Sequence, residues 1–227
     1  GIVCDGDRIS VGGRTTVADL LYSPEIAAAG PSLVEAARLF AGQMVRNAAT
    51  VGGNIACGSP AADLVPPLLS LDAEVTLVNG SGTRSVPLDE YFLGYKRDLR
   101  GQDELITRVS WRRPVERSAN AFYKLARRKG DAITVTGVAV TLSAEGERCS
   151  RARIALGAVA PVVMRAKRAE ALLEGETLGF AAIDAAARQA AEECQPIDDV
   201  RASAGYRRHA VEALVRRLLT QTRDRLI

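Results

Sequence analysis

The sequence predicts an α+β protein with two domains. In the first half of the chain, short helical patterns alternate with β-rich segments; in the second half, three β-rich segments come first and helical patterns follow. Between the halves, residues 112–118 are strongly charged and contain Pro114, as is common in domain linkers. We therefore expect an α/β domain at residues 1–113. At residues 118–227 we expect a domain built on a three-stranded antiparallel sheet covered by helices.

Short local signals predict the first elements. Alternating residues on both sides of the turn sequence DGD predict a β-hairpin over residues 2–12. The threonines at residues 15–16 precede an apolar pattern and predict the cap of a short helix. Pro31 opens a second helical pattern, whose apolar residues recur at helical spacing as far as Ala41.

A glycine-rich segment at residues 49–64 comes next, and further strands follow it. Residues 61–72 predict a helical turn, which we expect Pro66 and Pro67 to interrupt. Residues with β character predict strands at residues 73–79, 83–88 and 103–111. The stretch 91–100 is polar, and we expect it to be irregular.

The second half begins with its own predicted strands. They lie at residues 120–128, 132–143 and 149–160. Helical patterns then occupy residues 170–173, 181–194 and 206–219. Apolar residues lie on one face of the last pattern, which predicts a helix packed against the sheet.

Composition excludes several classes of protein. Hydrophobic residues make up 47% of the chain and charged residues 25%, which is typical of a globular protein and not of a disordered one. A net charge of +3 with only 4% aromatic residues does not favour nucleic-acid binding. The apolar runs are shorter than the roughly 18 residues of a membrane span, so we expect no membrane segment.

Cysteine and histidine are sparse. The cysteines lie far apart without a CxxC pair, at Cys4, Cys57, Cys149 and Cys194. This pattern indicates reduced thiols in a cytoplasmic protein and supports neither a zinc site nor an iron–sulfur cluster in this chain. His209 is the single histidine and lies in an Arg-rich helical pattern, so we expect a surface group. We predict no catalytic side chain and no metal ligand.

The glycine-rich segment is the strongest candidate for a binding site. Consecutive glycines such as Gly52 and Gly53 can point successive N–H groups into one concavity, a nest that binds phosphate. Thr50 and Asn54 add side-chain donors, and Asp63 could accept hydrogen bonds from sugar or ribityl hydroxyls. The spacing matches neither the Rossmann fingerprint nor a P-loop. From these residues alone, a tight structural turn and a nucleotide site stay equally open.

Longer stretches of the sequence resemble a known family. They are VRNAATVGGNIACGSPAADLVPPLLSLDAEVTLV, FLGYKR, DELITRV, YKLARRKGDAITVTGVAV and IALGAVAPVVMRAKRAEALLEG. Together they are similar to the FAD-binding subunit of the molybdenum hydroxylases, the family of carbon monoxide dehydrogenase and xanthine dehydrogenase. The resemblance covers essentially the whole chain and implies the two-domain FAD-binding fold of the molybdopterin dehydrogenase flavoproteins.

The resemblance also implies a set of FAD-binding residues. These are Phe40, Thr50, Val51, Gly52, Gly53, Asn54, Asp63, Ile106 and Lys124. The glycine segment would contact the diphosphate, and Phe40 would lie near the flavin. Ile106 is favoured over its neighbour Leu105. Core positions remain the alternative for Phe40 and Ile106, and a solvated basic strand end remains the alternative for Lys124.

The implied activity is electron transfer within a complex. FAD would take electrons from an iron–sulfur partner and pass them to an acceptor such as NAD or a quinone. The resemblance places the [2Fe–2S] clusters on a small subunit and the molybdenum–pterin centre on a large one. Two alternatives remain: a flavin-free homologue that acts as a scaffold for partner subunits, and the flavin reductase of cell-wall precursor synthesis, whose C-terminal chemistry is not seen.

The resemblance has one departure. Family members begin with a strand and a glycine-rich turn of the AGGT type, which contacts the other side of the diphosphate. Here the matching part begins at Gly1, beyond that turn. We therefore expect either a fragment or a homologue that has lost part of the site, and weak binding of FAD by the chain alone.

Overall fold

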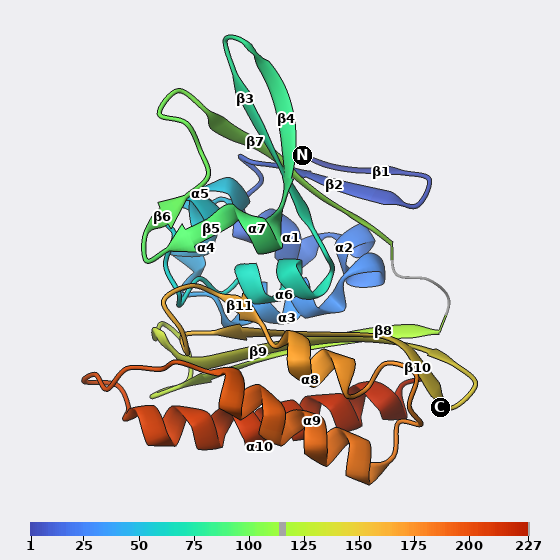
Figure 1. Ribbon diagram of the computed structural model, residues 1–227. Coiled ribbons are helices and arrows are strands. Elements are labelled where there is room, and N and C mark those ends of the chain that lie inside the picture. The colour runs from blue at the N-terminus through green and yellow to red at the C-terminus, as the bar shows by residue number, and fades with distance from the viewer. Residues whose placement is uncertain (114–116, 227) are drawn as a thin grey trace.

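The protein folds into two halves that pack on one another, each with its own sheet (Figure 1). The computed structural model describes residues 1–113 and 117–226. The predicted boundary at 112–118 therefore falls partly outside the described residues, because Pro114 and its two successors are not among them.

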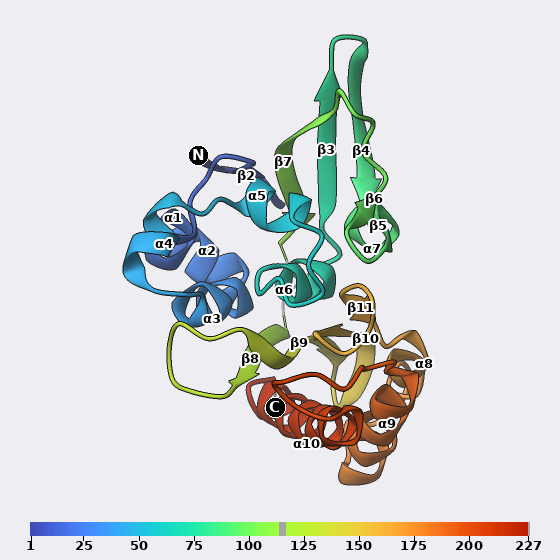
Figure 2. The same cartoon turned by 90° about the vertical axis from the view of Figure 1, so that its left-hand side faces the viewer.

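The first half contains a five-stranded antiparallel sheet in the order β1-β2-β7-β3-β4. Its strands are β1 (Ile2–Asp5), β2 (Arg8–Gly12), β3 (Glu74–Asn79), β4 (Gly82–Pro87) and β7 (Leu105–Arg112). Alternate residues such as Ile9, Val75 and Val109 are buried on one face, whereas their neighbours point to the other face. The predicted hairpin and strands are confirmed. The β3–β4 hairpin projects from the body of the molecule (Figure 2).

Short helices cover the buried face of this sheet. They are α1 (Val17–Tyr22), α2 (Pro24–Ala29), α3 (Pro31–Leu39), α4 (Gln43–Ala48), α5 (Val51–Ala56) and α6 (Val65–Ser70). Thr16 caps α1 in a reciprocal pair of hydrogen bonds with Asp19, as the threonines predicted. The expectation that Pro66 and Pro67 interrupt a helix was wrong. Both lie in the first turn of α6, where the missing N–H groups would have no partner in the helix anyway.

The stretch that looked irregular has its own structure. It contains the end of α7 (Leu88–Tyr91) and a small hairpin made of β5 (Phe92–Gly94) and β6 (Arg97–Asp98). Tyr91 anchors the base of this hairpin, since its side chain is fully buried and packs edge-on against Phe92. The hairpin therefore starts from a rigid position.

The second half contains a four-stranded antiparallel sheet in the order β11-β10-β9-β8. The predicted strands are β8 (Ser118–Ala126), β9 (Thr134–Glu145) and β10 (Arg148–Gly157), and the added strand is the two-residue β11 (Met164–Arg165). Such a short strand carries no sequence pattern, which is why three strands were predicted. The helices are α8 (Lys167–Ala171), α9 (Phe180–Glu193) and α10 (Ala204–Asp224).

The sheet of the second half is buried on both faces. Helix α10 lies on one face, while α3 and α6 of the first half lie on the other (Figures 1 and 2). Phe122 and Ala139 consequently belong to the hydrophobic core of the first half. The contact between the halves is thus a packed apolar interface, with polar groups placed within it.

Candidate functional site

Helix α5 begins at the predicted glycine segment, but the segment is not a nest. Val51 N–H donates to Thr15 O at 3.0 Å, and Gly52 N–H donates to Gly13 O at 2.9 Å. Gly53 N–H donates to the Thr50 hydroxyl, which caps the helix, at 3.1 Å. The donors of the first turn are therefore used within the protein, and the expectation of free N–H groups in a concavity was wrong.

Gly52 and Gly53 also lack the left-handed backbone that the nest requires. Both lie within α5, and neither is among the glycines with positive φ. Gly52 is needed for close packing instead, because a Cβ there would lie 2.8 Å from Gly13 O. Gly13 in turn lies so close to β7 that its own Cβ would be 2.3 Å from Ile106 O. These contacts support the interpretation that Gly52 serves a tight structural turn rather than a direct contact with a nucleotide.

Gly53 has the opposite surroundings. It is exposed, and a Cβ added to it would meet only the Thr50 hydroxyl oxygen, at 2.9 Å. The bare backbone of Gly53 and the half-buried Thr50 side chain thus lie together at the positive end of the helix dipole. Because the first-turn N–H groups are already bonded within the protein, the Thr50 hydroxyl is the group here that can donate a hydrogen to an anionic group close to the Gly53 backbone.

Asn54 connects α5 to the next part of the segment. Its side-chain oxygen accepts a hydrogen bond from Leu64 N–H at 3.2 Å, and the side chain is half-buried. Asn54 therefore fixes the chain that leads from α5 into α6, and it places Asp63 at the interface between the halves.

Asp63 and Lys124, two residues expected to bind the cofactor, form a buried ion pair. Lys124 Nζ lies 2.6 Å from the Asp63 carboxylate, and the two side chains are 5% and 9% exposed. Thr134 donates its hydroxyl hydrogen to the other carboxylate oxygen, and Lys124 also donates to Leu39 O at 3.2 Å. Burial raises the pKa of Asp63, while Lys124 and Thr134 oppose that effect. The pair links the two halves across their apolar interface, so Lys124 is not a solvated strand end.

The remaining predicted residues are largely core residues. Val51 is 1% exposed and belongs to the core of the first half. Phe40 and Ile106 are partly buried and pack against the same core, which supports the alternative that both are core residues. Each keeps some exposed surface, whereas Leu105 is 69% exposed.

A pocket between the halves was not predicted from the sequence. It has a volume of about 470 Å³. Residues 59–61 and Tyr95 of the first half line it, together with Thr134, residues 195–197, Asp199, Arg201 and Arg207 of the second half. Most of the lining is apolar. Thr134 lies both in the pocket wall and against Asp63, so the pocket adjoins the buried ion pair. No sequence motif marks it because its walls come from segments far apart in the chain.

The polar side of this pocket is an arginine–aspartate cluster. Arg207 is 3% exposed and donates to Val135 O at 2.6 Å, to Ala158 O at 2.9 Å and to Asp199 at 2.7 Å. Burial favours a higher pKa for Asp199, but donors from Arg201, Ala202 and Arg207 outweigh it and hold the pKa well below its ordinary value. The pocket therefore has a fixed charged edge beside apolar walls.

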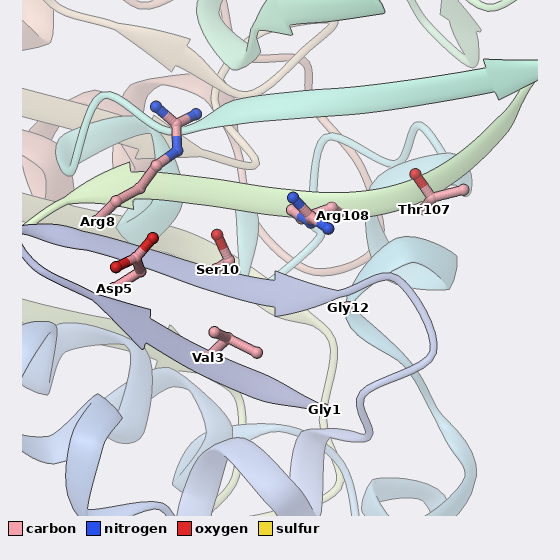
Figure 3. A pocket seen from close by; sticks show the side chains of 8 residues that line it. All are labelled: Gly1, Val3, Asp5, Arg8, Ser10, Gly12, Thr107 and Arg108. Carbon is pink, nitrogen blue, oxygen red and sulfur yellow. The ribbon is translucent and has the colours of Figure 1, made fainter. Parts of the chain in front are cut away.

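A second pocket, of about 380 Å³, lies on the outer face of the first sheet (Figure 3). Its side chains come from β1, β2 and β7, and they are Val3, Asp5, Arg8, Ser10, Thr107 and Arg108. Arg8 donates to Glu74 and to Ser110, so that guanidinium is already paired within the protein. The sheet separates this pocket from α5, since alternate residues of β2 point to opposite faces.

Within residues 1–113 and 117–226, no cluster of three or more His, Cys, Asp and Glu side chains is arranged to hold a metal ion. All the cysteines are free, and burial raises the pKa of Cys149 to about 11 and that of Cys194 to about 12. Over the same residues, no helix combines the length and apolar character needed to span a membrane.

Comparison with known proteins identifies both halves. Residues 1–111 match the family model of the FAD binding domain in molybdopterin dehydrogenase, and residues 121–222 match that of the CO dehydrogenase flavoprotein C-terminal domain. The chain is 35% identical over 219 residues to the carbon monoxide dehydrogenase medium chain of Hydrogenophaga pseudoflava. That match covers 96% of this chain and 76% of the relative.

Two further similarities have comparable extent. The chain is 36% identical over 218 residues to the 6-hydroxypseudooxynicotine dehydrogenase complex subunit alpha of Paenarthrobacter nicotinovorans, covering 96% of this chain and 73% of the relative. The solved structure of the Hydrogenophaga pseudoflava carbon monoxide dehydrogenase that lacks the Mo-pyranopterin moiety superimposes with a TM-score of 0.94 at 36% identity. That match covers 98% of this chain and 77% of the solved one.

Proposed function

The chain belongs to the FAD-binding medium subunits of the molybdenum hydroxylases of carbon monoxide dehydrogenase and xanthine dehydrogenase type, and from that premise we propose that it relays electrons from iron–sulfur clusters through FAD to an external acceptor. It is an oxidoreductase component and carries the FAD-binding domain of its family. FAD, when bound, accepts electrons singly or in pairs and releases them to a second molecule. The protein's own part is to bind the cofactor, orient it and admit the acceptor.

The first turn of α5 is the observation that carries this proposal, because it fits one end of a dinucleotide. Gly53 offers exposed backbone, Thr50 a hydroxyl, and the helix dipole a positive field, which together suit a diphosphate. Asn54 would add its side-chain amide. Val51 and Gly52, whose N–H groups are already bonded, would act by holding the helix against Gly13.

The interface between the halves fits the flavin end. Asp63 and Lys124 place a carboxylate and an ammonium group next to each other in an otherwise apolar surrounding. We propose that these groups set the hydrogen bonds offered to the cofactor there, with Phe40 and Ile106 providing the apolar surface they still expose. The chain would position the cofactor without any acid–base catalyst of its own.

The pocket between the halves is the proposed entry for the acceptor. It adjoins the Asp63–Lys124 pair through Thr134, and its volume of about 470 Å³ lies within the range of small-molecule sites. Its apolar walls and charged edge suit an organic acceptor such as NAD or a quinone.

We propose two partner subunits, a large one with the molybdenum–pterin centre and a small one with the [2Fe–2S] clusters. Support comes from relatives that are themselves a medium chain or a subunit of a dehydrogenase complex. We also place the assembled complex in the cytoplasm.

The test is flavin binding by the chain purified with its partner subunits. Gly53→Val puts a branched side chain against the Thr50 hydroxyl, and we expect FAD affinity to fall at least about tenfold with the circular dichroism spectrum unchanged. Gly205→Val is the matched control, because Gly205 is an exposed glycine in the first turn of α10 with nothing near its added Cβ.

Wild-type flavin content in the Gly53→Val variant would exclude the α5 site. A colourless wild-type chain that still assembles with its partners would instead support the flavin-free scaffold.

A further inference from the structure

Two cationic side chains hold the turn between α3 and α4. Leu39, Phe40 and Ala41 each have a carbonyl oxygen that accepts a hydrogen bond from one of them. Lys124 Nζ of the second half donates to Leu39 O at 3.2 Å. Arg46 Nη1 of α4 donates to Phe40 O at 2.9 Å and to Ala41 O at 2.8 Å. Phe40 is the middle residue of the three, so its backbone is fixed on both sides.

Ala41 gives this turn a conformation that needs support. Its φ is +33°, in the left-handed region that a residue with a side chain rarely adopts. Such a conformation persists where the surroundings hold it. Arg46 bonds directly to the carbonyl of this residue, and Gly42 follows it as the N-cap of α4. The turn therefore depends on Arg46 more than an unstrained turn would.

The guanidinium of Arg46 is itself held in place. Nη2 donates to Gln43 Oε1 at 3.1 Å, and Gln43 Nε2 donates in turn to Asn47 Oδ1 at 2.7 Å. The Arg46 side chain is half-buried, and the three oxygens that it bonds to are neutral. Because the guanidinium is planar and its donors have fixed directions, this arrangement fixes the two carbonyl groups of the turn relative to α4.

Phe40 lies where the orientation of an aromatic ring matters. Its side chain packs against the core of the first half and keeps part of its surface exposed. The turn also contacts the buried Asp63–Lys124 pair, through the hydrogen bond from Lys124 to Leu39 O. Phe40 is therefore next to the place proposed for the flavin end of FAD. Aromatic rings prefer offset-stacked or edge-on contacts, so a shift of the turn changes what the ring can contribute.

We propose that Arg46 is a positioning residue for the cofactor: it holds the Phe40–Ala41 turn and thereby fixes the orientation in which the Phe40 ring meets the flavin. This inference rests on the proposed function. Arg46 acts through Phe40 and does not touch FAD. With Lys124 it keeps the turn in one conformation before the cofactor arrives, which removes the cost of ordering the turn on binding.

Arg38 provides a control for simple attraction between a positive charge and an anionic cofactor. It lies two residues before Phe40, near the end of α3, and is exposed. Within residues 1–113 and 117–226 its side chain forms neither a hydrogen bond nor an ion pair. Arg38→Met therefore removes a nearby charge and leaves the turn intact.

The test measures FAD affinity in the complex assembled with its partner subunits and depleted of flavin. Arg46→Met removes both donors and keeps an apolar stem, and we expect the Kd for FAD to rise about 2-fold to 10-fold, the change that corresponds to one aromatic contact. Arg38→Met should leave the Kd unchanged. Arg46→Lys, whose ammonium can donate to the same carbonyl oxygens, should restore most of the affinity. The visible circular dichroism of the bound flavin should change in Arg46→Met and recover in Arg46→Lys.

A double-mutant cycle decides whether Arg46 acts through Phe40. Phe40→Ala should raise the Kd at least as much as Arg46→Met does. The double variant should bind FAD no more weakly than Phe40→Ala alone, because both substitutions remove the same contact. If Arg46→Met does not assemble with the partner subunits, Arg46→Gln takes its place in the cycle, since glutamine keeps an amide donor for one carbonyl oxygen.

The outcomes separate this inference from the proposed function. Additive losses of affinity in the double variant would overturn the inference, and so would equal Kd values for Arg46→Met and Arg38→Met. A wild-type Kd in Phe40→Ala would also overturn it and leave the α5 site standing. A wild-type complex that binds no FAD would overturn the proposed function itself.

Discussion

The two ends of the glycine-rich segment differ in exposure, in charge and in what they contact. At Gly53 the backbone is exposed, and its nearest neighbour is one hydroxyl group. At Asp63 a carboxylate is buried and bonded to Lys124 and Thr134 of the second half. A ligand can reach the first place without disturbing the fold, whereas the second place also holds the halves together.

Because of this difference, substitutions at the two ends of the segment report on different properties of the protein. A change at Gly53 tests binding, since little else depends on the residue. A change at Asp63 or Lys124 acts on stability first, because removal of one partner leaves the other buried without compensation. Loss of flavin in such a variant therefore says nothing about a direct contact until the stability has been measured.

The largest expected effect comes from Lys124→Met. The substitution keeps the length of the side chain and leaves the Asp63 carboxylate buried, so we expect the free energy of unfolding to fall by about 3–5 kcal/mol. Urea denaturation measures it. Lys167→Met is the matched control, because Lys167 pairs with Asp89 while 67% exposed, and it should cost under about 1 kcal/mol.

A second variant makes this prediction sharper. Adding Asp63→Asn to Lys124→Met removes the uncompensated charge and should restore part of the lost stability. If Lys124→Met lowers the free energy of unfolding no more than Lys167→Met does, the buried ion pair does not stabilise the contact between the halves. Asp63 would then differ from Gly53 in burial but not in its effect on stability.

Adjacent glycines provide the next test. Gly52→Ala places a Cβ 2.8 Å from the Gly13 carbonyl oxygen, which belongs to backbone and cannot rotate away, so we expect a loss of about 1–3 kcal/mol in the free energy of unfolding. At Gly53 the neighbour is a side-chain oxygen, and the better helix propensity of alanine offsets a weakened Thr50 cap, so Gly53→Ala should change stability by less than about 1 kcal/mol. Thermal unfolding of both variants decides the comparison; equal losses would contradict it.

The sequence predicted the fold better than it predicted the site. Alternation in the strands and the cap at Thr16 are local signals, and the corresponding elements are present. The nest was wrong because the first turn of α5 is satisfied by Gly13 and Thr15, which no local pattern reveals. The prolines of α6 could have been read correctly, since proline favours the first turn of a helix.

Long-range pairing accounts for the rest. Asp63 and Lys124 were each recognised through the resemblance, but nothing in the sequence indicates that they bond to each other across the interface. The pocket could not be predicted for the same reason, because it exists only where the halves meet. Gly58 did carry a signal: a glycine after a helix often adopts positive φ, and this one does.

The smallest expected effect concerns a partly exposed counterpart of the buried pair. Asp72 of the first half accepts hydrogen bonds from Arg151, Arg153 and Arg165 of the second, and its side chain is 29% exposed. Burial favours a higher pKa, but the hydrogen bond from Arg151 and the three positive charges outweigh it, so the pKa of Asp72 lies below its ordinary value of 3.8.

A carboxyl whose pKa is lowered by folding stabilises the fold while it is ionised, and that contribution is lost as the pH falls through the ordinary pKa towards the folded one. The free energy of unfolding of the wild type should therefore exceed that of Asp72→Asn by about 1 kcal/mol at neutral pH. The difference should stay constant down to about pH 5 and shrink towards about pH 3.5. Urea denaturation of both proteins across this range measures it, and other carboxylates cancel in the subtraction. A difference that does not change with pH would mean that Asp72 stays equally ionised in the folded and unfolded chains, and that its arginine partners do not join the halves electrostatically.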